Sequence, residues 1–184
     1  MTAPTLTTAP ASPGPAAAAP HPGYDLGLLL LRVAVGLTMA AHGSQKLFGW
    51  FNGSGLDATG QFFDSLGYPS GETMALVAGT SETFGGLALA LGLFTPLAAA
   101  AIVGTMLNAV AAVHWEGGFF SPAGIEYPMI LGLGAASLAL TGPGRYAADR
   151  FLPVPALRSH RLVTGLAAIA LALVTAALVL LFRD

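Results

Sequence analysis

Residues 26–50, LGLLLLRVAVGLTMAAHGSQKLFGW, are long and apolar enough to cross a lipid bilayer as one helix. The stretch nevertheless contains three ionisable side chains, Arg32, His42 and Lys46. Ionisable groups within a membrane-spanning helix are costly, so they normally face a protein interior or a cavity. At about 100° per residue the three fall on one stripe of the helix, and the opposite face is aliphatic. The pattern predicts a spanning helix whose polar side packs against the rest of the protein.

The composition of the whole chain predicts an integral membrane protein. Its 184 residues are 54% hydrophobic and 9% charged, whereas soluble domains carry about 25% charged residues. The formal net charge of −2 gives no electrostatic footprint for nucleic acid, so no nucleic-acid partner is expected. The absence of cysteine excludes disulfides, thiolate zinc sites, cysteine-ligated iron–sulfur clusters and a dithiol relay within this chain. No metal site is predicted.

Further apolar stretches are predicted to span the membrane. They are 73–94, 97–114, 126–141 and 162–182. The 126–141 stretch is at the lower length limit for crossing about 30 Å of hydrocarbon. The aromatic 51–71 segment is predicted to contain a short amphipathic helix at the level of the lipid headgroups. The fold class expected is therefore all-α, a polytopic membrane helical bundle in which four helices form a core and one C-terminal transmembrane helix is appended.

The chain is predicted to divide into four parts. Residues 1–23, rich in Ala, Pro and Thr, are expected to be a disordered tail, and they lack the regions of a signal peptide. Residues 24–150 form the four-helix membrane domain. Residues 151–161 form a basic linker, and residues 162–184 form the extra transmembrane helix.

The placement of arginines predicts the orientation of the chain. Four arginines lie between the last two predicted spans: Arg145, Arg150, Arg158 and Arg161. The other long loops contain no Lys or Arg, so the positive-inside rule places the basic linker in the cytoplasm. With five spans, the N-terminus is then cytoplasmic and the C-terminus outside. The expected location is the bacterial plasma (inner) membrane.

Seven polar side chains are predicted to converge on an intramembrane site that opens outward. They are Arg32, His42, Lys46, Glu82, Asn108, His114 and Glu126. Glu82 lies near the middle of its span, where no side chain can snorkel to the headgroups. It must be protonated or paired, and Arg32 is the leading candidate partner.

Each of these residues also has a structural interpretation. Lys46 and Arg32 could snorkel to the headgroups. Glu126 could stabilise a helix N-terminus through the helix dipole, and His114 could cap its helix. Asn108 could form an interhelical hydrogen bond. The proposed ion pair of Glu82 could itself be purely structural.

Two histidines leave a haem as a further alternative. His42 and His114 come from different predicted helices at similar depth, as bis-histidine ligation requires. Nucleophile triads, P-loops and Rossmann fingerprints are absent from the sequence, so catalytic residues are not assigned.

Several motifs, in the same order along the chain, resemble the DoxX family. They are Arg32-x3-Gly36-x5-His42-Gly43-x2-Lys46-x2-Gly49, Phe62-Phe63-x3-Gly67-Tyr68-Pro69, Glu82-x2-Gly85-Gly86-x5-Gly92-Leu93-x-Thr95, Glu126-Tyr127 and Gly142-Pro143-Gly144-Arg145-Tyr146-x2-Asp149. The resemblance covers residues 26–150 and implies a four-helix inner-membrane protein. Relatives include a subunit of a thiosulfate:quinone oxidoreductase and mycobacterial membrane partners that join a superoxide dismutase to a sulfurtransferase. The fifth helix and the Pro/Ala tail depart from the family pattern.

The leading functional hypothesis is a membrane subunit or partner of a redox system, linked to quinone, oxidative stress or sulfur, and at most an accessory subunit of an oxidoreductase. Lys46 and Arg32 would neutralise oxygen charge on a small anion or quinone headgroup, and His42 or Glu82 would move a proton. The cofactor is otherwise left open: quinone is the candidate of this hypothesis, and haem is the alternative.

Two other functions stay open: a carrier or binding protein for a small solute or lipid, and a scaffold whose cytoplasmic linker recruits a soluble enzyme. The expected partners are the lipid bilayer, a soluble redox enzyme on the cytoplasmic side, and further copies of the chain. Glycine-lined faces on the 73–94 and 97–114 spans would permit such self-association.

Overall fold

The computed structural model describes residues 22–120, 122–154 and 162–183, and within them the chain is helical, as predicted. The helices are α1 (Pro22–Phe48), α2 (Gly55–Ser65), α3 (Gly71–Leu91), α4 (Thr95–Ala109), α5 (Glu126–Thr141) and α7 (Leu162–Leu181). Short 3-10 or π turns occupy Trp50–Asn52, Val110–His114, Trp115–Gly117 and Ala148–Phe151. The predicted tail and basic linker lie largely in 1–21 and 155–161, outside the described residues.

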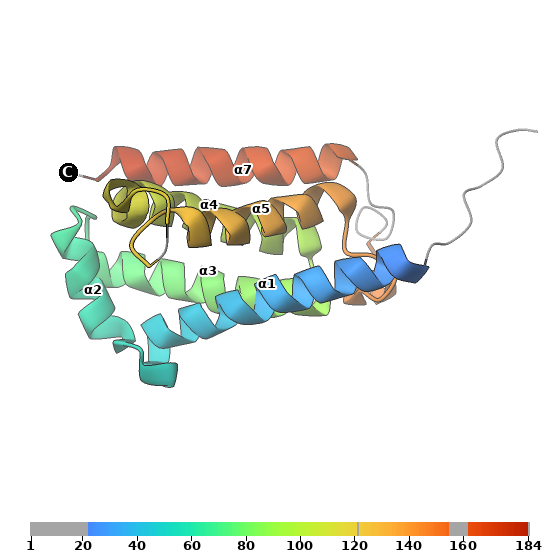
Figure 1. The fold of residues 1–184 in the computed structure, drawn as a ribbon, viewed down its shortest axis with the longest axis horizontal. Helices are drawn as coiled ribbons and strands as arrows, with labels where there is room; N and C mark the ends of the chain where they lie inside the picture. Colours follow the sequence, from blue (N-terminus) through green and yellow to red (C-terminus); the bar gives the residue numbers. More distant parts are fainter. Residues whose placement is uncertain (1–21, 121, 155–161, 184) are drawn as a thin grey trace, which may run out of the picture.

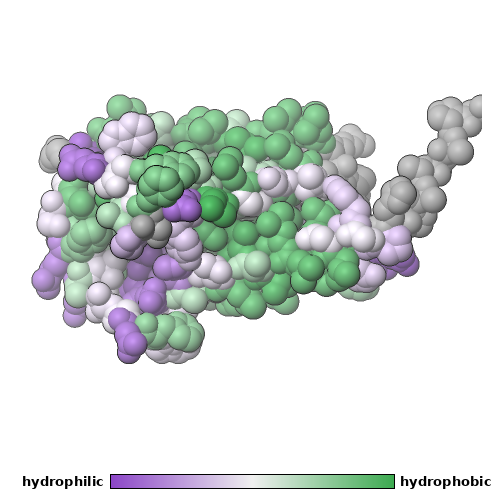
Figure 2. Space-filling view, in the orientation of Figure 1, coloured by the Kyte–Doolittle hydropathy of each residue, from purple (hydrophilic) through white to green (hydrophobic). Residues whose placement is uncertain are grey.

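The long helices run side by side, and α2 lies across one end of the bundle (Figure 1). Among the described helices, four are long and apolar enough to cross a membrane: 22–48, 71–91, 95–117 and 162–181. Helix α5 has only 16 residues, and it packs against α4 and α7. Hydrophobic side chains cover the middle of the bundle, whereas hydrophilic ones gather most densely toward the α2 end (Figure 2). The predicted four-helix core with an added C-terminal helix is confirmed.

Helices α1 and α3 touch backbone to backbone because glycines line both faces of their contact. A Cβ atom built on Gly36 would lie 2.5 Å from the carbonyl oxygen of Gly86. A Cβ atom on Gly43 would lie 2.4 Å from the backbone nitrogen of Thr83. Only glycine permits so close an approach of two helices. The α3 glycines at these contacts are therefore covered within the chain, and self-association through them would require α1 to move.

The end of the bundle opposite α2 is closed by the segment that follows α5. Asp149 is buried there, and its carboxylate accepts hydrogen bonds from the backbone N–H groups of Phe94 (2.6 Å) and Thr95 (3.0 Å). These N–H groups lie at the start of α4, where helical donors have no partner within the helix. The sequence motif ending at Asp149 is thus a cap for a helix that begins 54 residues earlier.

Candidate functional site

A cavity of about 510 Å³ lies inside the α2 end of the bundle. Its walls come from α1, α2, α3, α4, α5 and α7, and they mix apolar with polar side chains. Five of the seven predicted site residues line it: His42, Lys46, Glu82, Asn108 and His114. The structure therefore brings together most of the polar groups that the sequence places within the membrane.

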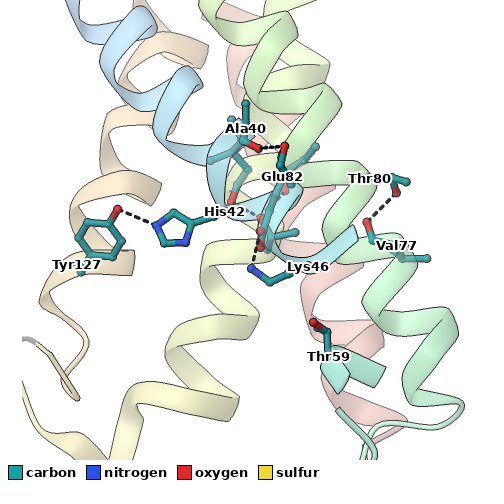
Figure 3. A network of polar contacts seen from close by, with 12 residues as sticks. Ala40, His42, Lys46, Thr59, Val77, Thr80, Glu82 and Tyr127 are labelled. Carbon is teal, nitrogen blue, oxygen red and sulfur yellow. Dashed lines mark hydrogen bonds and ion pairs between the residues drawn. The ribbon is translucent and has the colours of Figure 1, made fainter. Parts of the chain in front are cut away.

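The deepest polar contact of the cavity is an ion pair between α1 and α3. Lys46 Nζ lies 2.6 Å from Glu82 Oε2 and donates a hydrogen bond to it (Figure 3). The Glu82 side chain is 5% exposed and that of Lys46 is 26% exposed. The carboxylate is therefore enclosed by protein, while the ammonium group borders the cavity.

The predicted pairing of Glu82 with Arg32 is wrong. Arg32 is buried at the opposite end of α1, where its guanidinium donates to the backbone carbonyls of Pro143 (3.0 Å) and Tyr146. The glycine contacts set α1 and α3 antiparallel, with Gly43 beside Thr83. Glu82 therefore lies one turn from Lys46 and roughly 15 Å along the helix axis from Arg32. Arg32 holds the chain after α5 in place and does not line the cavity.

On the other side of the cavity, α1 and α5 are joined by a histidine and a tyrosine. His42 Nε2 lies 2.9 Å from the hydroxyl oxygen of Tyr127, and the two rings are tilted by 59° with centroids 5.6 Å apart (Figure 3). Tyr127 is a site residue that the sequence does not predict, although the Glu126-Tyr127 motif contains it. Tyr127 lines the cavity, and the predicted Glu126 is not among its lining residues.

The third polar group of the cavity belongs to α4 and the α2–α3 loop. The Tyr68 hydroxyl donates to Asn108 Oδ1 (3.1 Å), and Asn108 Nδ2 donates to the carbonyl of Gly104 (3.0 Å). Burial raises the pKa of the Tyr68 phenol, which the nearby Arg183 partly opposes. Tyr68 is therefore protonated at neutral pH and available as a donor.

His114 ends a π-helical turn, Val110–His114, that continues α4. π-Helical turns are rare in proteins, but those that occur are often found at functional sites. The ring nitrogen Nδ1 of His114 lies 3.0 Å from the carbonyl oxygen of Ala123. Because a carbonyl oxygen can only accept, Nδ1 carries a proton and donates to it.

His42 and His114, the two predicted haem ligands, both line the cavity. Each ring has one nitrogen on a protein partner, as metal-ligating histidines usually do, so the haem interpretation stays a prediction. The arrangement offers a mixture of hydrogen-bond donors and acceptors around an apolar space, as small-molecule sites commonly do.

Comparison with known proteins agrees with this architecture. Residues 27–115 match the DoxX family model. “Putative oxidoreductase CatD” of Bacillus subtilis (strain 168) is 34% identical over 129 residues, which cover 70% of this chain and 89% of that protein. “Inner membrane protein YphA” of Escherichia coli (strain K12) is 34% identical over 129 residues, covering 67% of this chain and 88% of that protein. No solved structure matches. The chain is a multi-pass membrane protein that belongs to the DoxX family.

Proposed function

We propose that the protein is a membrane subunit or partner of a redox system and that its cavity binds a quinone headgroup. One observation carries the proposal: a cavity of about 510 Å³ combines apolar walls with the Lys46–Glu82 ion pair and the His42–Tyr127 pair. The name of the relative CatD, which describes an oxidoreductase, supports the redox part.

The proposed ligand matches the chemistry of the cavity walls. A quinone headgroup is a flat apolar ring with two carbonyl oxygens, and it becomes a hydroquinone by taking up two electrons and two protons. Lys46 would donate a hydrogen bond to one oxygen as negative charge develops there. The hydrogen-bonded His42–Tyr127 pair can deliver one proton to the nearer oxygen, and the Lys46 ammonium can deliver the second proton to the other oxygen. Both proton donors are then reprotonated from water. In this proposal a partner protein supplies the electrons.

Glu82→Gln is expected to weaken quinone binding by about tenfold, because the substitution removes the charge that holds Lys46 at the cavity wall. The measurement is isothermal titration calorimetry, in which decylubiquinone is added to the purified protein in lipid nanodiscs. Glu72→Gln is the matched control, since Glu72 is exposed in the first turn of the same helix. It should bind like the wild type. Equal affinities of all three proteins, or no binding by the wild type, would rule out the proposed site.

We also propose that the α2 end faces outward and that a soluble redox enzyme docks on the cytoplasmic end. Arg145 and Arg150 support this orientation, because they follow α5 at the end of the bundle opposite α2. Helix α1 begins at that end and α7 finishes at the α2 end (Figure 1), in agreement with five passes.

The orientation can be tested in intact cells because the chain contains no cysteine. A cysteine introduced as Asp57→Cys on α2 should react with a membrane-impermeant maleimide, whereas one introduced as Ala148→Cys should react only after the membrane is opened. Labelling of Ala148→Cys but not Asp57→Cys in intact cells would show that the orientation is opposite to the one proposed. The proposed docking face would then lie outside the cell.

A further inference from the structure

Arg183, two residues after the end of α7, contacts the C-terminal end of α2 and the loop between α2 and α3. Arg183 Nε donates a 2.6 Å hydrogen bond to the carbonyl oxygen of Leu66, the residue that caps the C-terminal end of α2. A cation is favourable at a helix C-terminus, where carbonyl oxygens have no partner within the helix. The Arg183 guanidinium carbon also lies 5.9 Å from the ring centroid of Tyr68, within cation–π range.

Tyr68 connects these contacts of Arg183 to the cavity. Tyr68 is 7% exposed, its side chain lines the cavity, and its hydroxyl donates to Asn108 on α4. Val179, one helical turn before Arg183, also lines the cavity. The DoxX family model matches residues 27–115, which do not include α7. Helix α7 therefore contributes one wall residue, Val179, to a cavity that is otherwise lined by residues of the preceding helices and loops.

We propose that Arg183 is a positioning residue, which holds Tyr68 against Asn108 so that α7 closes the cavity wall to water on that side. The inference goes beyond the proposed redox function and holds for any ligand of the cavity. Its basis is a continuous set of contacts from α7 through the loop to α4.

A simpler role for Arg183 would be an anchor in the lipid headgroups. An anchor needs only a positive charge, so lysine would replace it fully. A positioning role needs the planar guanidinium, which can donate to Leu66 and stack on Tyr68 at the same time. The two roles therefore differ in their effect on the cavity wall.

The test uses a single cysteine in the cavity wall as a reporter. Ala109→Cys is suitable because Ala109 lines the cavity beside Asn108 and is partly buried. In nanodiscs, the rate of its reaction with a charged maleimide is measured with and without Arg183→Gln. The expected increase is about tenfold, the factor that loss of one charge-assisted hydrogen bond gives. Arg183→Lys should restore only part of the protection.

Two controls separate local opening from general loosening. Arg150→Gln removes another arginine that lies over an aromatic ring, Phe151, and should leave the Ala109→Cys rate unchanged. A second reporter, Ala135→Cys, is fully buried in the core and should stay unreactive in the Arg183→Gln background. Equal Ala109→Cys rates with and without Arg183, or simultaneous reaction of Ala135→Cys, would overturn the proposal.

Tyr68→Phe gives an independent reading of the same contact set. It removes the hydroxyl that reaches Asn108 and should also speed labelling of Ala109→Cys. Combined with Arg183→Gln it should add little, because both changes open one wall. Fully additive effects would show that Arg183 does not act through Tyr68. If Arg183→Gln does not accumulate, Tyr68→Phe and Arg183→Lys decide the question, and unchanged labelling in both overturns it.

Discussion

Gly36→Val is expected to prevent the chain from accumulating as a folded bundle. A Cβ atom at this position would lie 2.5 Å from the carbonyl oxygen of Gly86 and 2.6 Å from the backbone nitrogen of Ala90. Both obstacles are backbone atoms, so a change of side-chain rotamer cannot relieve the clash. The two helices would have to separate along their whole contact, at a loss of about 3 kcal/mol or more in the free energy of unfolding.

The measurement is unfolding of the purified protein in mixed micelles, together with the amount of protein found in the membrane. Gly27→Val is the matched control, because it lies on the same helix and nothing lies within 4 Å of its Cβ position. Its effect should stay within about 1 kcal/mol. Gly86→Val, which meets α1 from the other side, should fail as Gly36→Val does. A stable, abundant Gly36→Val protein would show that α1 and α3 do not pack as described.

The sequence predicts the helices well because the bilayer limits what a chain can do. A stretch that is apolar for 20 residues and carries His42 and Lys46 on one stripe must turn that stripe inward, whatever its neighbours are. The same constraint makes two further features predictable from the type of residue and its depth in the membrane. They are the helix at 126–141 and the positions of Asn108 and His114 in the cavity wall.

The partner of each polar group is less predictable, because it depends on how two helices are aligned. Arg32 and Lys46 share one face of α1, and either could reach a carboxylate on a neighbouring helix. The position of α1 along α3 is fixed by the backbone contact between Gly36 and Gly86. The spacing of residues along a single helix cannot predict such a contact between two helices. The same limit explains Tyr127, whose hydroxyl gains a role only when α5 lies beside His42.

Lys46→Met is expected to destabilise the protein more than Glu82→Gln does, although both break the same ion pair. Lys46→Met leaves the Glu82 carboxylate, 5% exposed, without its counter-charge, which typically costs about 3–5 kcal/mol. Glu82→Gln leaves Lys46, whose side chain is 26% exposed and can reach water in the cavity. We expect that loss to be about 1–2 kcal/mol. Urea or SDS titrations of the purified variants provide the comparison.

The double variant Lys46→Met/Glu82→Leu separates stability from function. Replacing a buried ion pair with apolar groups of similar size is often neutral or stabilising, so this protein should recover most of the stability that Lys46→Met loses. It should still fail to bind decylubiquinone, because the donor at the cavity wall is gone. Arg145→Met, an exposed site at the far end of the bundle, is the control for removing one positive charge. If the double variant is as unstable as Lys46→Met, the pair is structural. If it is stable and still binds quinone, the ion pair is not part of the binding site.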